Sequence, residues 1–212
     1  MTDGKAWRLG SALTCLALLT ACAGGGGTPE TGAPAADKTS IVLSDSGVEV
    51  DGRAAPADAD AAVYVGADIV YYEDGRDETY GEGAEEDAHT AEEAAAHTVV
   101  TITQPGTYRV SGTLSLGQLA VDLGEDAEED PEAVVTLILD GADITCTVAP
   151  AVIFYNVYEC ASGDEEEASP AVDTSAAGAN VVLSDGSVNN ITGSYVARIY
   201  EEGTTDKLHK YD

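Results

Sequence analysis

The chain has 212 residues, of which 39 are acidic and only 9 are basic, and its formal net charge is −30 at neutral pH. This charge excludes nucleic acid and anionic lipid headgroups as direct partners, because few cationic side chains are present to replace their counterions. Calcium, cationic partners and plain solvation remain compatible with it. The aromatic content is 6%, so the core must be built mainly from aliphatic side chains.

The N-terminus has the pattern of an export signal. Lys5 and Arg8 precede an apolar run, Leu9 to Leu19, which is too short for a stable membrane span but suits a signal peptide. The run ends in Leu19-Thr20-Ala21-Cys22, which resembles the lipobox that bacterial signal peptidase II reads. We therefore expect residues 1–21 to be a lipoprotein signal peptide, and the chain to be exported and lipid-anchored to the membrane through Cys22, facing the extracytoplasmic space. An ordinary signal peptide with a chance cysteine is the alternative.

Residues 22–40 are small and polar, with the run Ala23-Gly24-Gly25-Gly26-Gly27-Thr28-Pro29 near their start. Such a composition cannot bury a core and behaves as a flexible tether. Cleavage before Cys22 would remove one acidic and two basic residues, which takes the formal charge from −30 to −31. We expect residues 22–40 to be a tether that holds a domain away from the membrane.

Residues 41–98 combine short β-rich stretches with one helical pattern. The stretches are Ile41–Leu43, Val48–Val50, Ala62–Val65 and Asp68–Tyr72, separated by Gly and Asp turn signals. An Ala- and Glu-rich segment follows, in which Thr90 and Glu93 have the spacing of a capping box. We expect one short N-terminal capping helix there, with a solvated acidic loop as the alternative.

Residues 99–212 read as a ladder of short strands. Two imperfect copies of a strand, an Asp-Gly turn and a second strand occur at Thr136–Thr145 and Val181–Val188. A repeat of this kind is typical of a solenoid, in which each coil buries its inward side chains against the next one. The pattern predicts an all-β, right-handed parallel β-helix, and a hairpin-built sandwich or jelly roll is the alternative.

Two motif stretches carry a family resemblance. Thr101 to Leu114 (TITQPGTYRVSGTL) and Val135 to Thr145 (VTLILDGADIT) are similar to the start of the bacterial carbohydrate-binding domain-containing β-helix family. Members resemble pectate lyases in fold, with bound calcium, and the resemblance implies polysaccharide binding more than cleavage. Relatives continue for many more coils, so we expect this chain to be an incomplete fragment that holds the first coils.

Cys146 and Cys160 are the two cysteines left after Cys15 is removed and Cys22 is lipidated. An extracytoplasmic compartment permits a disulfide between them, which would stabilise the fold by about 3 kcal/mol in the chain-entropy model. Two buried thiols are the alternative. Neither a CxxC motif nor a nearby histidine supports metal binding by these cysteines.

Calcium needs hard oxygen ligands that cluster at a turn. Asp140 and Asp143 flank the first Asp-Gly pair, Asp122 is expected on a neighbouring coil, and Asp185 takes the corresponding place in the second copy. We interpret these four aspartates as calcium ligands. Asp-Gly is also a turn signal in its own right, so turn-forming aspartates without metal are the alternative.

The only tryptophan, Trp7, lies in the predicted signal peptide, so stacking on sugar rings must rely on tyrosine. The candidates for carbohydrate binding are Tyr155, Tyr158, Tyr195 and Tyr200. No HExxH or GxSxG motif is present. The sequence therefore predicts no enzyme, although Arg109 or Arg198 would be the base of a lyase of this fold class.

The leading hypothesis is a surface-tethered, non-catalytic polysaccharide-binding lipoprotein that is calcium-dependent and binds cellulose-like or pectic polymers. A surface structural or adhesion protein with protein partners is the second hypothesis, and a polysaccharide lyase is the third. The negative charge predicts no nucleic-acid partner in any of the three.

Overall fold

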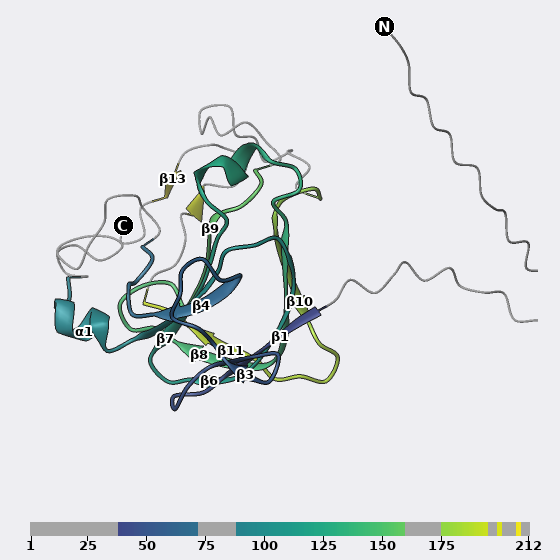
Figure 1. Cartoon of the computed structure of the whole chain (residues 1–212). Helices are drawn as coiled ribbons and strands as arrows, with labels where there is room; N and C mark the ends of the chain where they lie inside the picture. Colours follow the sequence, from purple (N-terminus) through teal and green to yellow (C-terminus); the bar gives the residue numbers. More distant parts are fainter. Residues whose placement is uncertain (1–37, 72–87, 160–174, 195–198, 201–206, 209–212) are drawn as a thin grey trace, which may run out of the picture. The chain divides into compact units, whose positions relative to one another are not determined.

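The computed structural model describes residues 38–71, 88–159, 175–194, 199–200 and 207–208 (Figure 1). The strands, in chain order, are β1 (Lys38–Leu43), β2 (Glu49–Val50), β3 (Arg53–Ala54), β4 (Val63–Gly66), β5 (Thr98–Ile102), β6 (Gly106–Leu114), β7 (Gly117–Asp122), β8 (Val135–Thr145), β9 (Val152–Asn156), β10 (Ala179–Leu183), β11 (Asn190–Thr192), β12 (Ile199–Tyr200) and β13 (Lys207–Leu208). Two short helical elements are α1 (Ala91–Ala95) and the 3-10 helix η2 (Glu125–Glu129). Within these ranges no helix has the length and apolar character needed to cross a membrane.

The larger sheet, sheet A, has the strand order β10-β8-β6-β1-β2-β3, and β11 also pairs with β8. The strands β1, β6, β8, β10 and β11 pair in parallel, whereas β2 and β3 are added as antiparallel strands. The β2–β3 hairpin turns at Asp51 and Gly52, whose φ angles are 50° and 72°. Two successive left-handed residues are what a two-residue hairpin loop requires.

The smaller sheet, sheet B, has the order β4-β5-β7-β9, with β4 antiparallel to β5 and the other pairs parallel. From β5 to β10 the chain passes alternately between the two sheets, so that β5, β7 and β9 lie in sheet B and β6, β8 and β10 in sheet A. A parallel pair needs a crossover between its strands, and here the crossover is a strand of the other sheet.

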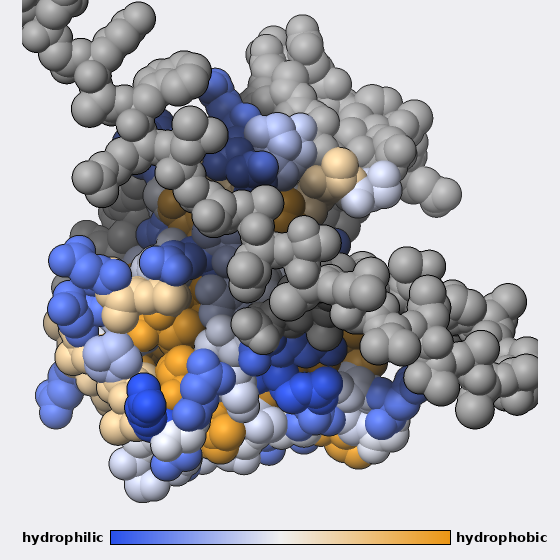
Figure 2. All heavy atoms as spheres, turned by 45° about the vertical axis from the view of Figure 1, so that its right-hand side comes forward, coloured by the Kyte–Doolittle hydropathy of each residue, from blue (hydrophilic) through white to orange (hydrophobic). Residues whose placement is uncertain are grey.

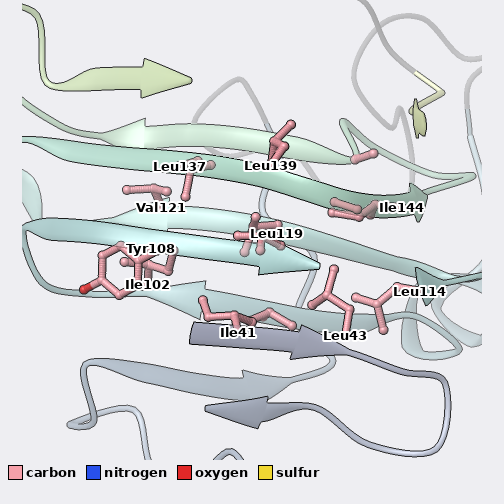
Figure 3. Packing of buried hydrophobic residues seen from close by; sticks show 14 of the residues in the cluster. Ile41, Leu43, Ile102, Tyr108, Leu114, Leu119, Val121, Leu137, Leu139 and Ile144 are labelled. Carbon is pink, nitrogen blue, oxygen red and sulfur yellow. The ribbon is translucent and has the colours of Figure 1, made fainter. Parts of the chain in front are cut away.

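One hydrophobic core contains residues of both sheets, as the close-up in Figure 3 shows. Sheet A contributes Ile41, Leu114 and Ile144, and sheet B contributes Ile102 and Leu119, all completely buried. Along each strand these residues alternate with others that face away from the core, because successive side chains of a strand point to opposite faces. Each sheet therefore has an inward, apolar face and an outward face.

The predicted all-β class is present, but the predicted right-handed parallel β-helix is wrong. Apart from the separate antiparallel pair β12–β13, the described strands form two mixed sheets, in which the antiparallel pairs β1–β2, β2–β3 and β4–β5 are combined with the parallel ones. The physical reason lies at the N-terminal strands, whose short connections at Ser44–Val48 and Asp51–Gly52 allow hairpins but no crossover. Strand spacing in the sequence carries no information about this choice of pairing.

The two Asp-Gly pairs of the sequence repeat have different structures. Asp185 and Gly186 form the predicted turn after β10, where Ser187 N–H donates to the carbonyl of Ser184. Asp140 and Gly141 instead lie inside the continuous strand β8, at a register shift against β6. Gly141 has a φ of +82°, as the bulged position of a strand often does. The predicted turn at Asp140 is therefore a β-bulge.

The capping box at Thr90 is confirmed. Glu93 N–H donates to the Thr90 hydroxyl, and Thr90 N–H donates to the Glu93 carboxylate at 2.8 Å. The helix α1 has only five residues and no buried residue. His97 follows the C-cap of this helix; it is 3% exposed, and its ring nitrogens contact the Glu93 carbonyl and the Thr147 N–H.

Candidate functional site

The outward faces of the two sheets differ in exposure. The outward side of β5, β7 and β9 in sheet B is largely buried: Val99, Thr101, Gln118, Ala120 and Ile153 are at most 5% exposed, and Tyr155 is half-buried. The outward residues of sheet A are mostly half-buried or exposed. A ligand can therefore reach the outward face of sheet A, whereas that of sheet B is occupied by the chain itself.

Gln118 explains how sheet B is covered. Its side-chain amide donates to the carbonyls of Val70 and Pro150, both at 2.8 Å, and its oxygen accepts the N–H of Val70 at 2.9 Å. Ile69 and Val70 then pack on Val99, Ala120 and Ile153. The segment Asp68–Tyr72 was expected to be a strand, but its described residues 68–71 form a covering segment outside both sheets.

The outward face of sheet A is built from rows of residues that the parallel register aligns across the strands. The rows are Lys38, Thr107, Thr136 and Asn180, then Ser40, Arg109, Ile138 and Val182, then Thr113, Asp143 and Asn190. Most side chains in these rows carry hydroxyl, amide or charged groups. Ile138 and Val182, which are neighbours in the second row, form an apolar step between the polar rows. The side that comes forward in Figure 2, where β10 lies in Figure 1, mixes hydrophilic and hydrophobic residues in the same way.

Arg109 is the centre of this face. Its Nη1 donates to Asp140 Oδ2 at 2.7 Å and to Ser184 Oγ at 3.2 Å. The three residues come from β6, from β8 and from the end of β10, so the contact depends on the sheet register. We call these residues the Arg109 group.

The Arg109 group has little to contribute to folding. The side chains of Arg109 and Asp140 are 39% and 41% exposed, and exposed ion pairs contribute only about 0–1 kcal/mol to stability. Both described bonds of the guanidinium come from Nη1, and a guanidinium has five N–H donors. The group can thus offer further donors and a carboxylate acceptor to a ligand.

The bulge in β8 positions Asp140. Asn189 Oδ1 accepts the N–H groups of both Gly141 and Ala142 at 2.9 Å, and its Nδ2 donates to Ser187 Oγ at 2.8 Å. These bonds hold the turn after β10 against the bulge. They place Ser184 and Asp140 on either side of the Arg109 guanidinium, so the second copy of the sequence repeat supports the first.

The structure does not gather the four predicted calcium ligands into one cluster. Asp122 accepts the N–H of Gly124 and the Asn156 amide, at 3.0 and 2.7 Å, whereas Asp140 is paired with Arg109. Asp143 lies on the outward face beside Asn190, and Asp185 is exposed in the turn after β10. Among the residues that the structure describes, no three His, Cys, Asp or Glu side chains are placed to hold one metal ion.

The two predicted tyrosines whose side chains the structure describes, Tyr155 and Tyr158, are not on the outward face of sheet A. Tyr155 is half-buried and packs on the covered side of sheet B, with Val99, Ala120 and Ile153. Tyr158 is half-buried after β9, where its main chain bonds to Ala133 and Gly178. Tyr200 is described only as part of the backbone of β12, and Tyr195 lies outside the described residues.

The cysteine predictions fall largely outside the described residues. Cys146 is 1% exposed in the core, whereas Cys160 and Cys22 belong to ranges that the structure does not describe. The disulfide between Cys146 and Cys160, and the lipidation of Cys22, therefore stay predictions.

One signal in the sequence points to the Arg109 group. The chain has only nine basic residues and 39 acidic ones, and Arg109 is one of the nine. It stands between Tyr108 and Val110 on a predicted strand, so its side chain is expected on the opposite face from theirs. Its partners Asp140 and Ser184 are 31 and 75 positions away. Only the register of β6, β8 and β10 identifies them.

A comparison with known protein families gives one match, which covers residues 96–203 and thus just over half of the chain. The match begins just before β5 and includes β10 and β11, so the residues of the Arg109 group all lie within it. No curated protein matches the chain, and no solved structure does. The chain belongs to the family described as carbohydrate-binding domain-containing protein.

Proposed function

We propose that the chain binds polysaccharide, without cleaving it, through the outward face of sheet A. The Arg109 group carries the proposal, because it places a donor and an acceptor side by side on an accessible face. Each hydroxyl of a sugar both donates and accepts hydrogen bonds, and bonds to charged groups are stronger than neutral ones. The family membership supports the same conclusion.

The regularity of the face suits a polymer. Neighbouring strands are about 4.8 Å apart, and outward residues of one strand follow each other at about 6.6 Å. Thr107, Thr136 and Asn180 repeat a polar group at the first of these spacings across β6, β8 and β10. The apolar step of Ile138 and Val182 can contact the C–H groups of a sugar ring. A ligand with repeating hydroxyls would find matching groups along such a grid.

The charge of the protein selects among polymers. At a formal net charge of −30 the chain repels polyuronates unless a cation intervenes, and the one guanidinium of the Arg109 group is already paired with Asp140. We therefore propose a neutral, cellulose-like glucan as the direct ligand. Binding to a pectic polymer would require calcium as a bridge between carboxylates.

Binding without cleavage is consistent with the state of Arg109. A lyase needs a base that can accept a proton, but this guanidinium is engaged as a donor to a carboxylate and a hydroxyl. The second arginine considered as a base, Arg198, lies outside the described residues. We propose that polymer length stays unchanged on binding.

The export signal completes the proposal, with Cys22 as the lipid attachment site and a tether that ends at residue 37 instead of the predicted residue 40, because Lys38 begins β1. An exported, membrane-anchored module could then hold polysaccharide at the cell surface. Metabolic labelling with a fatty acid tests this part, since Cys22→Ala should abolish the label. Unchanged labelling of the variant would exclude Cys22 as the acceptor.

Retention on insoluble cellulose tests the binding site. Arg109→Ala should raise the dissociation constant for cellulose about tenfold, which corresponds to the loss of about 1.4 kcal/mol of binding free energy. Arg53→Ala is the matched control, because it removes the same charge from the exposed end of β3, and its retention should equal that of the wild type. Equal retention of both variants would contradict the assigned face.

The same assay separates the rival functions. Polygalacturonate should retain the chain only when calcium is present, whereas cellulose should retain it in a chelator as well. New absorbance from unsaturated products would identify a lyase. No retention on either polymer would overturn the proposal and favour the adhesion hypothesis.

A further inference from the structure

The exposed apolar side chains of the described residues are concentrated at one edge of sheet A. Seven large apolar residues are exposed among the described residues, and five of these seven lie on or next to β10 and β11. These five residues, which we call the open edge, are Val181, Val182, Leu183, Val188 and Ile191, with 54%, 48%, 64%, 77% and 42% of their surface exposed. Exposed apolar side chains that gather in one region of a protein often mark an interaction surface.

The open edge is the end of the hydrophobic core. The register aligns Tyr108 and Leu137 with Val181, and Val110 and Leu139 with Leu183. The first two members of each row are at most 5% exposed, whereas Val181 and Leu183 are more than half exposed. The inward face of sheet A therefore continues past the point at which the described residues cover it.

The backbone of β10 is also open on one side. β10 pairs only with β8 among the described strands and is the terminal strand of sheet A. Proteins commonly protect such edges with charged residues or proline. β10 has neither, and from Ser175 to Ser194 the only charged residue is Asp185, in a chain whose charged content is 23%.

The opposite edge of sheet A is protected. It ends in the two-residue strands β2 and β3, which carry exposed Glu49, Asp51 and Arg53. Head-to-tail stacking of one copy on the next would have to pair the open edge with this charged hairpin. An uncharged edge buries the open edge without desolvating a charge, and the same edge of a second copy is uncharged.

We propose that the open edge is a homodimer interface in which β10 pairs antiparallel with β10 of a second copy. A two-fold axis perpendicular to the sheet, at Val182, places Val181 opposite Leu183 of the second copy and keeps both on the inward side. The exposed inward side chains of the two copies then bury each other. The pairing also brings two chains of net charge −30 together at a segment that holds one charged residue, so screening of the remaining charges by salt strengthens it.

Sedimentation velocity of the whole chain over a range of concentration and of NaCl tests this interface. The wild type should form a discrete dimer whose dissociation constant falls as salt rises. Leu183→Lys should weaken dimerisation by about tenfold or more, because it desolvates a cation at the centre of the interface. The added lysine reduces the net negative charge, so general repulsion cannot explain a loss. Val182→Lys should act in the same direction.

The matched control is Val42→Lys, which places the same cation on an exposed valine of β1 and should leave the dimer unchanged. A chain that stays monomeric at every concentration and salt would overturn the interface. So would a dimer that Leu183→Lys leaves intact, or open-ended growth into larger species. Retention on cellulose by Leu183→Lys at the wild-type level would show that dimerisation and polysaccharide binding are separate properties.

Discussion

The outward faces of the two sheets are built from similar strands, but the face of sheet B is covered by the chain and that of sheet A is accessible. In sheet B a single buried glutamine, Gln118, binds the backbone of Val70 and fixes a covering segment over the strands. In sheet A the corresponding positions carry Thr107, Arg109 and Thr136, which bond to neighbouring side chains or remain accessible. The comparison shows that accessibility is decided by where the polar groups find their partners. The covered face contributes to stability, whereas the outward face of sheet A is the one that we propose to bind a ligand.

The largest loss of stability should come from disturbing the pairing of β1 with β6, on which the outward face of sheet A depends. Gly112 has a φ of +89°, and a Cβ at this position would lie 2.2 Å from the carbonyl oxygen of Leu43. Gly112→Ala should therefore lower the free energy of unfolding by about 3 kcal/mol or more. Urea denaturation measures it.

The loss expected for Gly112→Ala has two causes, the positive φ angle and the clash of the added Cβ with Leu43. Gly124→Ala separates them. Gly124 has a similar φ of +92°, but nothing lies within 4 Å of a Cβ there. Its φ of 92° and ψ of 162° lie in a region that is nearly restricted to glycine, so this variant should lose only the cost of that backbone conformation, about 1–3 kcal/mol. Equal losses in the two variants would mean that the close approach of β1 to β6 is unimportant.

The second-largest loss of stability should come from the covered face of sheet B. Gln118→Leu keeps the volume but leaves the N–H and carbonyl of Val70 without their side-chain partner, and we expect a loss of about 1–3 kcal/mol. Gln104→Leu, at an exposed position before β6, is the control and should change stability by less than about 0.5 kcal/mol. Hydrogen exchange of residues 68–71 should accelerate in Gln118→Leu alone. Unchanged exchange would contradict the role given to Gln118.

The smallest effect concerns an exposed carboxylate at the turn between β1 and β2. Asp45 accepts the N–H and the hydroxyl of Ser115 at 2.7 and 2.8 Å. The backbone N–H first, and the hydroxyl second, lower the pKa of Asp45 below its ordinary value of 3.8. A carboxyl with a lowered pKa in the folded state contributes stability above that ordinary value, and the contribution is lost as the pH falls through the folded-state pKa.

Asp45→Asn should therefore be less stable than the wild type at pH 6, and the difference should shrink as the pH falls below 3.8. Thermal unfolding at a series of pH values measures it. Asp126→Asn removes a charge from the exposed η2 segment and serves as the control for net charge. A difference between wild type and Asp45→Asn that stays constant with pH would refute the role of ionised Asp45.

The sequence predicted those features that depend on neighbouring residues. The predicted strand Val134–Leu139 follows from a β-branched and aliphatic run and corresponds to the first part of β8, and the capping box follows from the spacing of Thr90 and Glu93. The pairing of the strands depended on connection geometry, so the β-helix prediction failed where β2 and β3 turn back as hairpins.

The candidate site was harder to predict because its members are distant in the chain. Asp140 was recognised, but as a calcium ligand at a turn, since an Asp-Gly pair gives the same sequence signal in a turn and in a bulge. Its partner Arg109 becomes visible only when β6 and β8 are set in register. Tyr155 is aromatic and half-buried, and the sequence contains no sign that its side of sheet B is covered.

Chemical-shift mapping with a soluble cello-oligosaccharide tests most directly the claim that the outward face of sheet A binds sugar. Titration into the isotope-labelled chain should shift the amide signals of Thr107, Arg109, Thr136 and Asn180, which lie on that face. The signals of Gln118 and Ala120, on the covered face of sheet B, should stay in place. Shifts confined to sheet B, or no shifts at saturating oligosaccharide, would contradict the assignment.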